Sequence, residues 1–309
     1  MTDYKSLINK TIEKIGEVIL GKEQPVRLAL ACLLARGHLL IEDLPGLGKT
    51  TLAHTLAGVL GLGFQRIQFT SDLLPADILG VSIFDRDSNR FNFHPGPIFT
   101  PLVLADEVNR ATPKAQSALL EAMAERQITV DGVTHPLPEP FFVIATQNPL
   151  HLIGTFPLPE SQLDRFLLRI EMGYPDSKAE RALLEGEQRQ EMLKSIQPVM
   201  QLPVLKELQQ QVDSIHASDA LLDYLQALIT FTRTDPLYQN GLSPRAGLAL
   251  LAVSRAWALM AGRSHVLPED IQTVLPAVAG HRLQVRDDQG SDSGGDPVSH
   301  LLESVPLPA

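Results

Sequence analysis

Short apolar runs alternate with helical patterns over roughly the first 175 residues of the chain. Each run ends in polar residues, which is typical of buried parallel strands joined by crossover helices. Between the third and fourth runs, Ala115, Leu119 and Met123 fall on one helical face, and Thr112-Pro113 is a typical helix start. The pattern predicts an α/β domain on a five-stranded parallel sheet, with strands at residues 38–43, 64–70, 101–107, 141–148 and 166–172.

Two stretches interrupt this alternation and are predicted to form β-hairpins. VSIFDRDSNRFNF, residues 81–93, has hydrophobic arms around a polar tip, and QITVDGVTHPL, residues 127–137, turns at Asp131-Gly132. An Asp-Gly pair between alternating hydrophobic residues is one of the strongest short hairpin signals. We interpret both hairpins as insertions into the α/β domain.

Only helical patterns follow Pro175. Strong helix starts such as Ser243-Pro244 and the amphipathic spacing predict a compact all-helical lid, with helices at residues 177–193, 204–215, 219–233, 243–260 and 267–279. We place the two domains at residues 1–180 and 181–309. Residues 286–298 are rich in Gly, Asp and Ser, and we expect a mobile loop there, to which we assign no function.

Composition narrows the class of protein. The 309 residues are 44% hydrophobic and 20% charged, as in a soluble globular protein, and no uncharged apolar run approaches the ~20 residues of a membrane span. We therefore expect no membrane insertion. The N-terminus lacks a signal-peptide pattern and the only cysteine, Cys32, lies in an apolar stretch, so a cytoplasmic location is expected. A net charge of −10 disfavours nucleic acid as a partner.

A candidate phosphate-binding loop lies between the first strand and the next helix. The tripeptide Gly48-Lys49-Thr50 is a weak signal by itself, but here it follows an apolar strand directly and opens a helix. In that context the loop amides face anionic oxygens, Lys49 reaches the outer phosphates and Thr50 holds Mg²⁺. A glycine-rich turn without a ligand is the alternative. The candidate nucleotide contacts are Pro45, Gly46, Leu47, Gly48, Lys49, Thr50 and Thr51.

The loop departs from its usual pattern at Asp43, where glycine is expected. Aspartate is tolerable there if the backbone does not need a positive φ, and aspartate is also among the residues that visit such geometry most readily. The departure therefore weakens the match without breaking it.

Two carboxylates end the third strand, and an amide ends the fourth. Adjacent acidic residues at the buried end of a parallel strand are costly unless a cation and a reaction use them. Asp106 is predicted to position Mg²⁺ through water, and Glu107 to polarise the water that attacks the γ-phosphate. Asn148 is predicted to orient that water. Taken singly, these residues are more typical of strands that meet solvated turns, and it is their combination with the loop that favours the catalytic interpretation.

Three arginines are candidates for charge stabilisation at a nucleotide. Arg165 and Arg169 follow a helix-like segment near the rim of the first domain, where one of them can serve a neighbouring subunit as an arginine finger. Surface ion pairs, for example between Asp164 and Arg169, are the alternative. Arg245 opens a helix of the lid and can reach the phosphates when the lid closes, or it can be a plain helix-start arginine.

Together these residues resemble the MoxR group of AAA+ ATPases. The resemblance rests on IEDLPGLGKTTLA, GPIFTPLVLADEVNRATPKAQSALLEAMAE, VIATQNP, FPLPESQLDRF and LSPRAGLALL, and it covers about residues 10–300. It implies strand order 5-1-4-3-2, a helical lid, and a ring, commonly a homo-hexamer, with ATP at subunit interfaces. It identifies the hairpins as the helix-2 insert and the pre-sensor-1 hairpin, and Asp43 as a family variant.

The same resemblance assigns roles to single residues. Lys49 and Thr50 match Walker A, and Asp106 and Glu107 match Walker B. Asn148 matches sensor 1, Arg165 the arginine finger and Arg245 sensor 2, while Val18, Ile19 and Gly21 match the segment against adenine. Similar proteins are chaperone-like ATPases that mature enzymes or insert metal cofactors with partners bearing a von Willebrand factor A (VWA) domain.

The sequence therefore predicts a cytoplasmic, Mg²⁺-dependent ATPase that remodels a protein client. One alternative is a DNA motor or a magnesium-chelatase-like subunit, because related AAA+ branches share both hairpins. Another is a nucleotide-gated scaffold that binds ATP and hardly hydrolyses it, against which the intact Glu107, Asn148 and Arg165 argue.

Overall fold

The computed structural model describes residues 4–87, 89–148, 154–185, 192–193, 195–286 and 296–307. Five parallel strands form its central sheet in the order β2-β5-β8-β1-β9. Counted along the chain this order is 2-3-4-1-5, which confirms the expected 5-1-4-3-2 sheet. The strands are β1 (Leu39–Glu42), β2 (Phe64–Gln68), β5 (Leu102–Asp106), β8 (Phe142–Gln147) and β9 (Leu168–Ile170).

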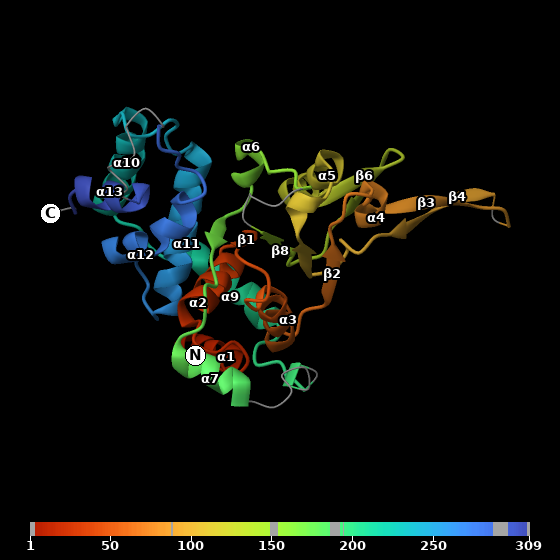
Figure 1. Ribbon diagram of the computed structural model, residues 1–309, viewed down its shortest axis with the longest axis horizontal. Helices are drawn as coiled ribbons and strands as arrows, with labels where there is room; N and C mark the ends of the chain where they lie inside the picture. Colours follow the sequence, from red (N-terminus) through yellow and green to blue (C-terminus); the bar gives the residue numbers. More distant parts are fainter. Residues whose placement is uncertain are drawn as a thin grey trace.

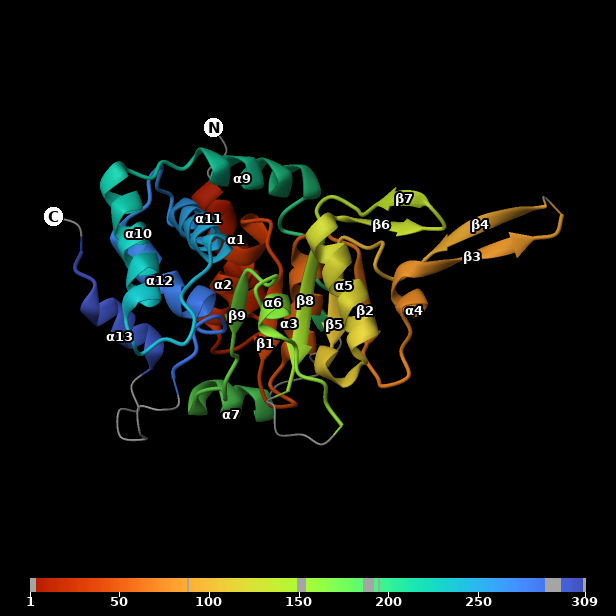
Figure 2. The same ribbon diagram turned by 90° about the horizontal axis from the view of Figure 1, so that it is seen from above.

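Both faces of the sheet are buried, because successive strand residues enter two different hydrophobic clusters. Leu39 and Ile41 of β1 belong to one cluster and Leu40 to the other. Helices α2 and α3 pack into the first cluster, and α5 into the second (Figures 1 and 2). The helices of this part of the chain are α1 (Tyr4–Gly16), α2 (Glu23–Leu34), α3 (Lys49–Val59), α4 (Pro75–Leu79), α5 (Pro113–Glu125), α6 (Glu160–Leu163) and α7 (Ser177–Glu185).

Both predicted hairpins are present as separate two-stranded sheets. They comprise β3 (Gly80–Asp85) with β4 (Arg90–Pro95), and β6 (Gln127–Val130) with β7 (Val133–Pro136). The turn of the second hairpin has positive φ at Asp131 and Gly132, as its sequence predicted. The β3–β4 hairpin projects well beyond the sheet (Figures 1 and 2). Its base meets the second hairpin where the Phe93 and His135 rings stack at 4.1 Å.

The remaining part of the chain that the structure describes is helical, as expected. Its helices are α9 (Leu202–Ser214), α10 (Asp219–Thr234), α11 (Pro244–Met260), α12 (Pro268–Ala279) and α13 (Pro297–Ser304). Ser243 caps α11 by accepting a hydrogen bond from the Ala246 amide, which explains the strong start signal. The expected helix at residues 177–193 is described as far as Glu185, and most of the expected mobile loop at residues 286–298 lies outside the described residues. None of the described helices is long and apolar enough to span a membrane.

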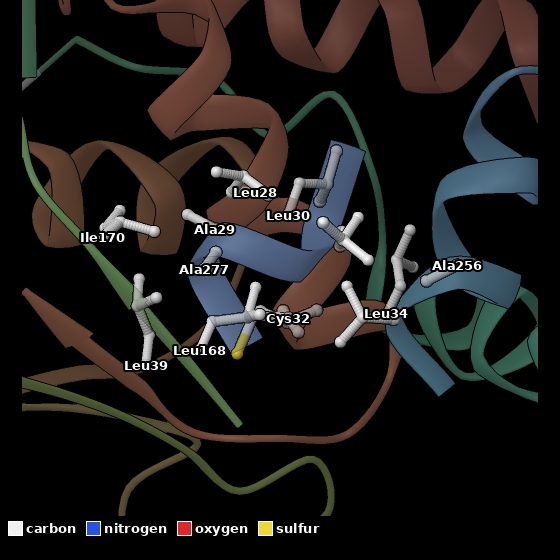
Figure 3. Packing of buried hydrophobic residues seen from close by; sticks show 14 of the residues in the cluster. Leu28, Ala29, Leu30, Cys32, Leu34, Leu39, Leu168, Ile170, Ala256 and Ala277 are labelled. Atoms are coloured by element: carbon white, nitrogen blue, oxygen red, sulfur yellow. The ribbon is translucent and has the colours of Figure 1, made fainter. Parts of the chain in front are cut away.

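The lid shares a core with the first helices of the chain. Figure 3 shows Cys32 and its α2 neighbours packed with Leu39 and Leu168 of the sheet and with Ala256 and Ala277 of α11 and α12. Cys32 is fully buried, and this burial raises the pKa of its thiol. The division at residues 1–180 and 181–309 stays a prediction, because α2 packs against α9 and α11 across that boundary.

Candidate functional site

The loop between β1 and α3 has the backbone that its glycines predict. Gly46 and Gly48 have φ values of 85° and 88°, in the left-handed region that favours glycine. A Cβ at either position would meet nothing within 4 Å, so the glycines serve the backbone conformation and leave open space beside the loop. Gly48 is followed at once by the first turn of α3, whose amides and dipole favour an anion at this point.

Lys49, the first residue of α3, is 8% exposed and turns back toward the loop. Its Nζ donates to the carbonyl oxygens of Asp43 and Leu44 and, at 3.1 Å, to Oδ1 of Asn148. Burial lowers the pKa of Lys49, while the negative charges of Asp43, Asp106 and Glu107 act in the opposite direction. The ammonium group therefore lies between the phosphate-binding loop and the ends of β5 and β8.

Asp43, the unexpected residue of the loop, is a structural anchor. Its backbone lies outside the left-handed region, so no glycine is needed there. Its Oδ2 accepts hydrogen bonds from the amides of Met172 and Gly173 at 2.7 and 2.6 Å, and its Oδ1 accepts one from the Leu44 amide at 2.8 Å. The carboxylate thus ties the start of the loop to the chain that leaves β9.

Asp106 ends β5 as a buried carboxylate whose two oxygens have different partners. Oδ1 accepts a hydrogen bond from the Thr146 hydroxyl at 2.5 Å. Oδ2 accepts from Nε and Nη2 of Arg66, at 3.0 and 2.7 Å. The Arg66 side chain is half exposed and comes from the neighbouring strand β2, so it can leave without disturbing the core.

Glu107 follows in a left-handed conformation, with φ 58° and ψ 50°. Such a backbone is unusual for a residue other than glycine, and it recurs at functional sites. The Glu107 carboxylate accepts hydrogen bonds from Asn148 Nδ2 and Gln68 Nε2, both at 3.0 Å, and Arg110 Nε lies 3.2 Å away. Its amide donates to the Thr146 hydroxyl. Asn148 therefore bridges Lys49 and Glu107 with the two ends of one amide group.

A cavity of about 530 Å³ adjoins the loop. The loop residues Pro45 to Gly48 and Thr51 form one wall, and Val18, Ile19 and Leu20 form another. Apolar walls beside a polar phosphate loop suit a nucleotide base. Gly21 does not line this cavity; with φ 69° and no room for a Cβ beside Ala179, it allows the chain to turn against α7. Further lining residues come from the β9–α7 segment and from α7: Met172, Tyr174, Pro175, Glu180, Leu183 and Leu184.

The predicted arginines lie apart from this centre. Arg165 donates through Nη1 to the Leu120 carbonyl of α5. Arg245 is largely exposed, and its Nη1 lies 3.9 Å from Asp164. Arg169 pairs with Glu42 at 2.9 Å, so the suggested pair with Asp164 is wrong. Glu42 lies on the neighbouring strand β1, two residues beyond Leu40, which is the register partner of Arg169.

Sequence reasoning missed the residues that hold the two carboxylates. Arg66 and Gln68 share one face of β2, and Thr146 of β8 shares a face with Asn148, which follows that strand; all four lie near the carboxyl ends of their strands. The rule that ligands bind outside the carboxyl ends of parallel strands could have found Gln68 and Thr146. Arg66 gives no such signal, because an arginine on an exposed edge strand is common.

These residues fit a nucleoside triphosphate and Mg²⁺. The Thr50 hydroxyl and the Asp106 carboxylate are hard oxygen ligands of the kind Mg²⁺ prefers, and Lys49 and the loop amides are complementary to phosphate oxygens. The cradle is open at Gly46 and Gly48, where an approaching phosphate meets no side chain.

Comparison with known proteins agrees with this geometry. Residues 38–168 match the family model described as ATPase family associated with various cellular activities (AAA), and residues 230–301 match the AAA lid domain. A relative from Bacillus subtilis (strain 168), Uncharacterized protein YeaC, is 45% identical over 92% of this chain and 88% of its own. Chaperone MoxR1 of Mycobacterium tuberculosis is 38% identical over 97% of this chain and 82% of its own. The crystal structure of a candidate ATPase from Cytophaga hutchinsonii, 34% identical, superimposes with a TM-score of 0.87 over 98% of this chain and 96% of its own.

Proposed function

Because the chain belongs to the MoxR family of AAA+ ATPases, we propose that it hydrolyses ATP at the carboxyl ends of β1, β5 and β8 to remodel a protein client. One observation carries this proposal: a single amide, that of Asn148, contacts both the Lys49 ammonium and the Glu107 carboxylate. Phosphate-binding and water-activating groups are thereby within reach of one triphosphate.

The loop and the start of α3 bind the substrate. Amides of residues 46–51 and the Lys49 ammonium neutralise the phosphates, and the cavity lined by Ile19 takes the base. Gly21 does not line this cavity and contributes by letting the adjacent chain turn against α7. Thr50 and, through water, Asp106 hold Mg²⁺, which supplies charge neutralisation on the phosphate oxygens when bound. Lys49 exchanges its loop carbonyl partners for phosphate oxygens, which is favourable because a charged acceptor replaces neutral ones.

Glu107 and Asn148 serve the attacking water. The Glu107 carboxylate accepts a hydrogen bond from the water and thereby raises the electron density on the water oxygen. The Asn148 amide fixes the orientation of the water. Both side chains keep their geometry because Thr146 binds the Glu107 amide and Asn109 donates to the Asn148 carbonyl at 3.1 Å.

Charge stabilisation comes from arginines outside the protomer's own centre. Arg165 acts as the finger of a neighbouring subunit in a ring, which we propose is a homo-hexamer, and Arg245 reaches the phosphates when the lid closes. The contact of Arg165 with Leu120 is compatible with this role, since that carbonyl is on the side of the sheet away from α3.

One relative is named a chaperone, which supports a protein client. On the family resemblance we further propose a VWA-domain partner, metal cofactor insertion as the outcome of remodelling, and the cytoplasm as the location.

Two substitutions test the site. Glu107→Gln keeps ATP bound while lowering turnover at least about 100-fold, because the general base is lost. Lys49→Ala weakens ATP binding strongly. Glu139→Gln and Lys206→Ala, which break an exposed ion pair before the amino-terminal end of β8, at the end of the strand opposite to the site, are matched controls and should behave as wild type. Turnover of Glu107→Gln within a few-fold of wild type, or unchanged affinity of Lys49→Ala, contradicts the assignment. Wild-type protein that binds ATP without any turnover would identify a scaffold instead.

The intersubunit site is tested by mixing. Arg165→Ala and Glu107→Gln should each retain only a small residual turnover, but a mixed ring contains interfaces with an intact Glu107 on one side and an intact Arg165 on the other. Recovery of turnover on mixing supports a finger in trans. No recovery at any ratio counts against it.

A further inference from the structure

Arg282 follows α12 and is one of the most thoroughly bonded side chains of the lid. Its side chain is 6% exposed, and a guanidinium carries five N–H donors. Nε donates to Asp164 Oδ1 at 2.7 Å, Nη1 to the carbonyls of Leu167 and Val278, and Nη2 to those of Phe166, at 2.6 Å, and Asp164, at 3.3 Å. All five donors are therefore used.

Four of these five bonds go to one short segment, residues 164–167. This segment joins α6 to β9, and Arg165 lies inside it. His281 adds a further contact, with its Nε2 3.3 Å from the Phe166 carbonyl. The other side of the segment is fixed as well, because Phe166 is fully buried in the core beneath α5. The lid thus holds the backbone on both sides of Arg165.

Asp164 links the same segment to the second lid arginine. Its Oδ2 accepts a hydrogen bond from the Ser243 hydroxyl at 3.3 Å, and Arg245 Nη1 lies 3.9 Å away. A movement of α11 or α12 relative to the sheet must therefore either carry residues 164–167 along or break these bonds. Breaking them leaves the buried guanidinium without its carboxylate, which is strongly unfavourable.

We propose that Arg282 is a positioning residue that couples the lid of one protomer to the arginine finger it offers to the next. The inference rests on the proposed function, in which Arg245 responds to the protomer's own nucleotide and Arg165 acts on the neighbour's. Lid closure over one nucleotide then sets the position of Arg165 at the adjacent site through Asp164 and Arg282. Nucleotide binding at each site thereby affects the position of the arginine finger at one neighbouring site.

The test uses Arg282→Gln in the full-length protein. Turnover of the assembled protein should fall about 10- to 100-fold, the range expected when a catalytic group is displaced by about 1 Å. ATP affinity should stay within about two-fold of wild type, because the nucleotide-binding loop is untouched. The matched control is Arg263→Gln, which breaks the Arg263–Asp270 pair at the other end of α12 but contacts nothing in residues 164–167. That control should keep its turnover even if its melting temperature falls.

Two further measurements separate positioning from mere stabilisation. In a mixture with Glu107→Gln, Arg282→Gln should regain turnover as Arg165→Ala does, because its own nucleotide site is intact and only its finger is misplaced. In the double variant with Arg165→Ala, Arg282→Gln should lower turnover no further, since no finger is left to position. If Arg282→Gln does not fold, Arg282→Lys, which keeps the charge but cannot make five bonds, is used in both experiments.

The outcomes distinguish the two proposals. If mixing with Glu107→Gln restores turnover to Arg165→Ala but not to the Arg282 variant, the coupling is contradicted while the proposed ATPase function is not. An additional loss in the double variant also overturns it. No recovery with either variant removes the finger in trans, and the coupling with it.

Discussion

Replacing Asp43 by glycine, which restores the usual phosphate-loop pattern, is expected to damage the site. The Asp43 carboxylate accepts two short hydrogen bonds from the amides of Met172 and Gly173 and one from Leu44. Bonds to a charged group contribute about 1.5–3 kcal/mol each. The Leu44 amide is in an exposed stretch where water can replace the carboxylate, and Asp43 is half-buried, so we count two bonds at the lower value, about 3 kcal/mol. Added glycine flexibility costs about 0.5–1 kcal/mol more.

Two measurements follow from this magnitude. The melting temperature of Asp43→Gly should fall by about 7–16 °C, since about 1 kcal/mol corresponds to 2–4 °C in a chain of this order of size. ATP affinity should fall about 10- to 100-fold, because the loop and the β9–α7 wall of the cavity are no longer held together and a smaller fraction of molecules is competent to bind. Titration with a fluorescent ATP analogue measures the second effect, and Asp43→Asn, which keeps one acceptor oxygen, should lie between.

The matched control is Asp296→Gly. Asp296 also accepts two backbone hydrogen bonds, from Val298 and Ser299, but it caps α13 far from the loop. The Asp296→Gly substitution should lower stability and leave ATP affinity unchanged. If Asp43→Gly instead bound ATP as tightly as wild type and melted at the same temperature, the carboxylate would be no anchor, and its presence would be neutral variation.

Three other substitutions give separate predictions. Arg66→Gln removes a half-exposed cation whose interaction with Asp106 contributes about 0.5–1 kcal/mol. If Arg66 and Mg²⁺ compete for Asp106, half-maximal turnover of the variant should need about two- to five-fold less Mg²⁺. An unchanged or higher requirement would contradict this competition. Thr146→Val leaves Oδ1 of Asp106 and the Glu107 amide without their hydroxyl partner, at a cost of about 1–3 kcal/mol each. Turnover should therefore fall at least ten-fold, and wild-type turnover would show that the hydroxyl is dispensable. Burial lowers the pKa of His38 to about 4, below the ~6.5 of a histidine in an unfolded chain. As the pH falls, the unfolded state therefore takes up the proton first, and about 3 kcal/mol of stability should be lost between pH 6.5 and 4. Chemical denaturation should show a flatter pH dependence for His38→Gln and an unchanged one for the exposed His265→Gln; equal slopes in all three proteins would exclude His38 as the cause.

The sheet and most of the lid could be predicted from the sequence because their signals are local. A buried parallel strand is a continuous apolar run, and both of its faces need burial, which is what Leu39 to Ile41 show. The hairpin at Asp131-Gly132 follows from the backbone that this pair prefers. The order of the strands came from the family resemblance, since periodicity alone does not say which strands are neighbours.

The candidate site was predictable where its residues end a strand or start a helix. Lys49, Asp106 and Asn148 have such positions, and the carboxyl ends of parallel strands meet at one edge, so their proximity follows from topology. Asp43 was recognised only as a departure. Its function as an anchor depends on two amides more than 100 residues away in the chain, and backbone amides carry no sequence signal.

The choice of the proposed finger arginine illustrates a different limit. Arg165 and Arg169 have the same side chain and neighbouring positions, so residue type cannot choose between them. Their backbone environments can: Arg169 lies on β9 and is paired with Glu42 of its own sheet, where release would leave a carboxylate unpaired. Within the described part of the chain, the Arg165 side chain has one bond, to a backbone carbonyl, which water can replace at little cost, while the segment around it is held rigidly by the lid. A residue that must act outside its own subunit needs a loosely bound side chain on a firmly held backbone, and of these two arginines only Arg165 combines them.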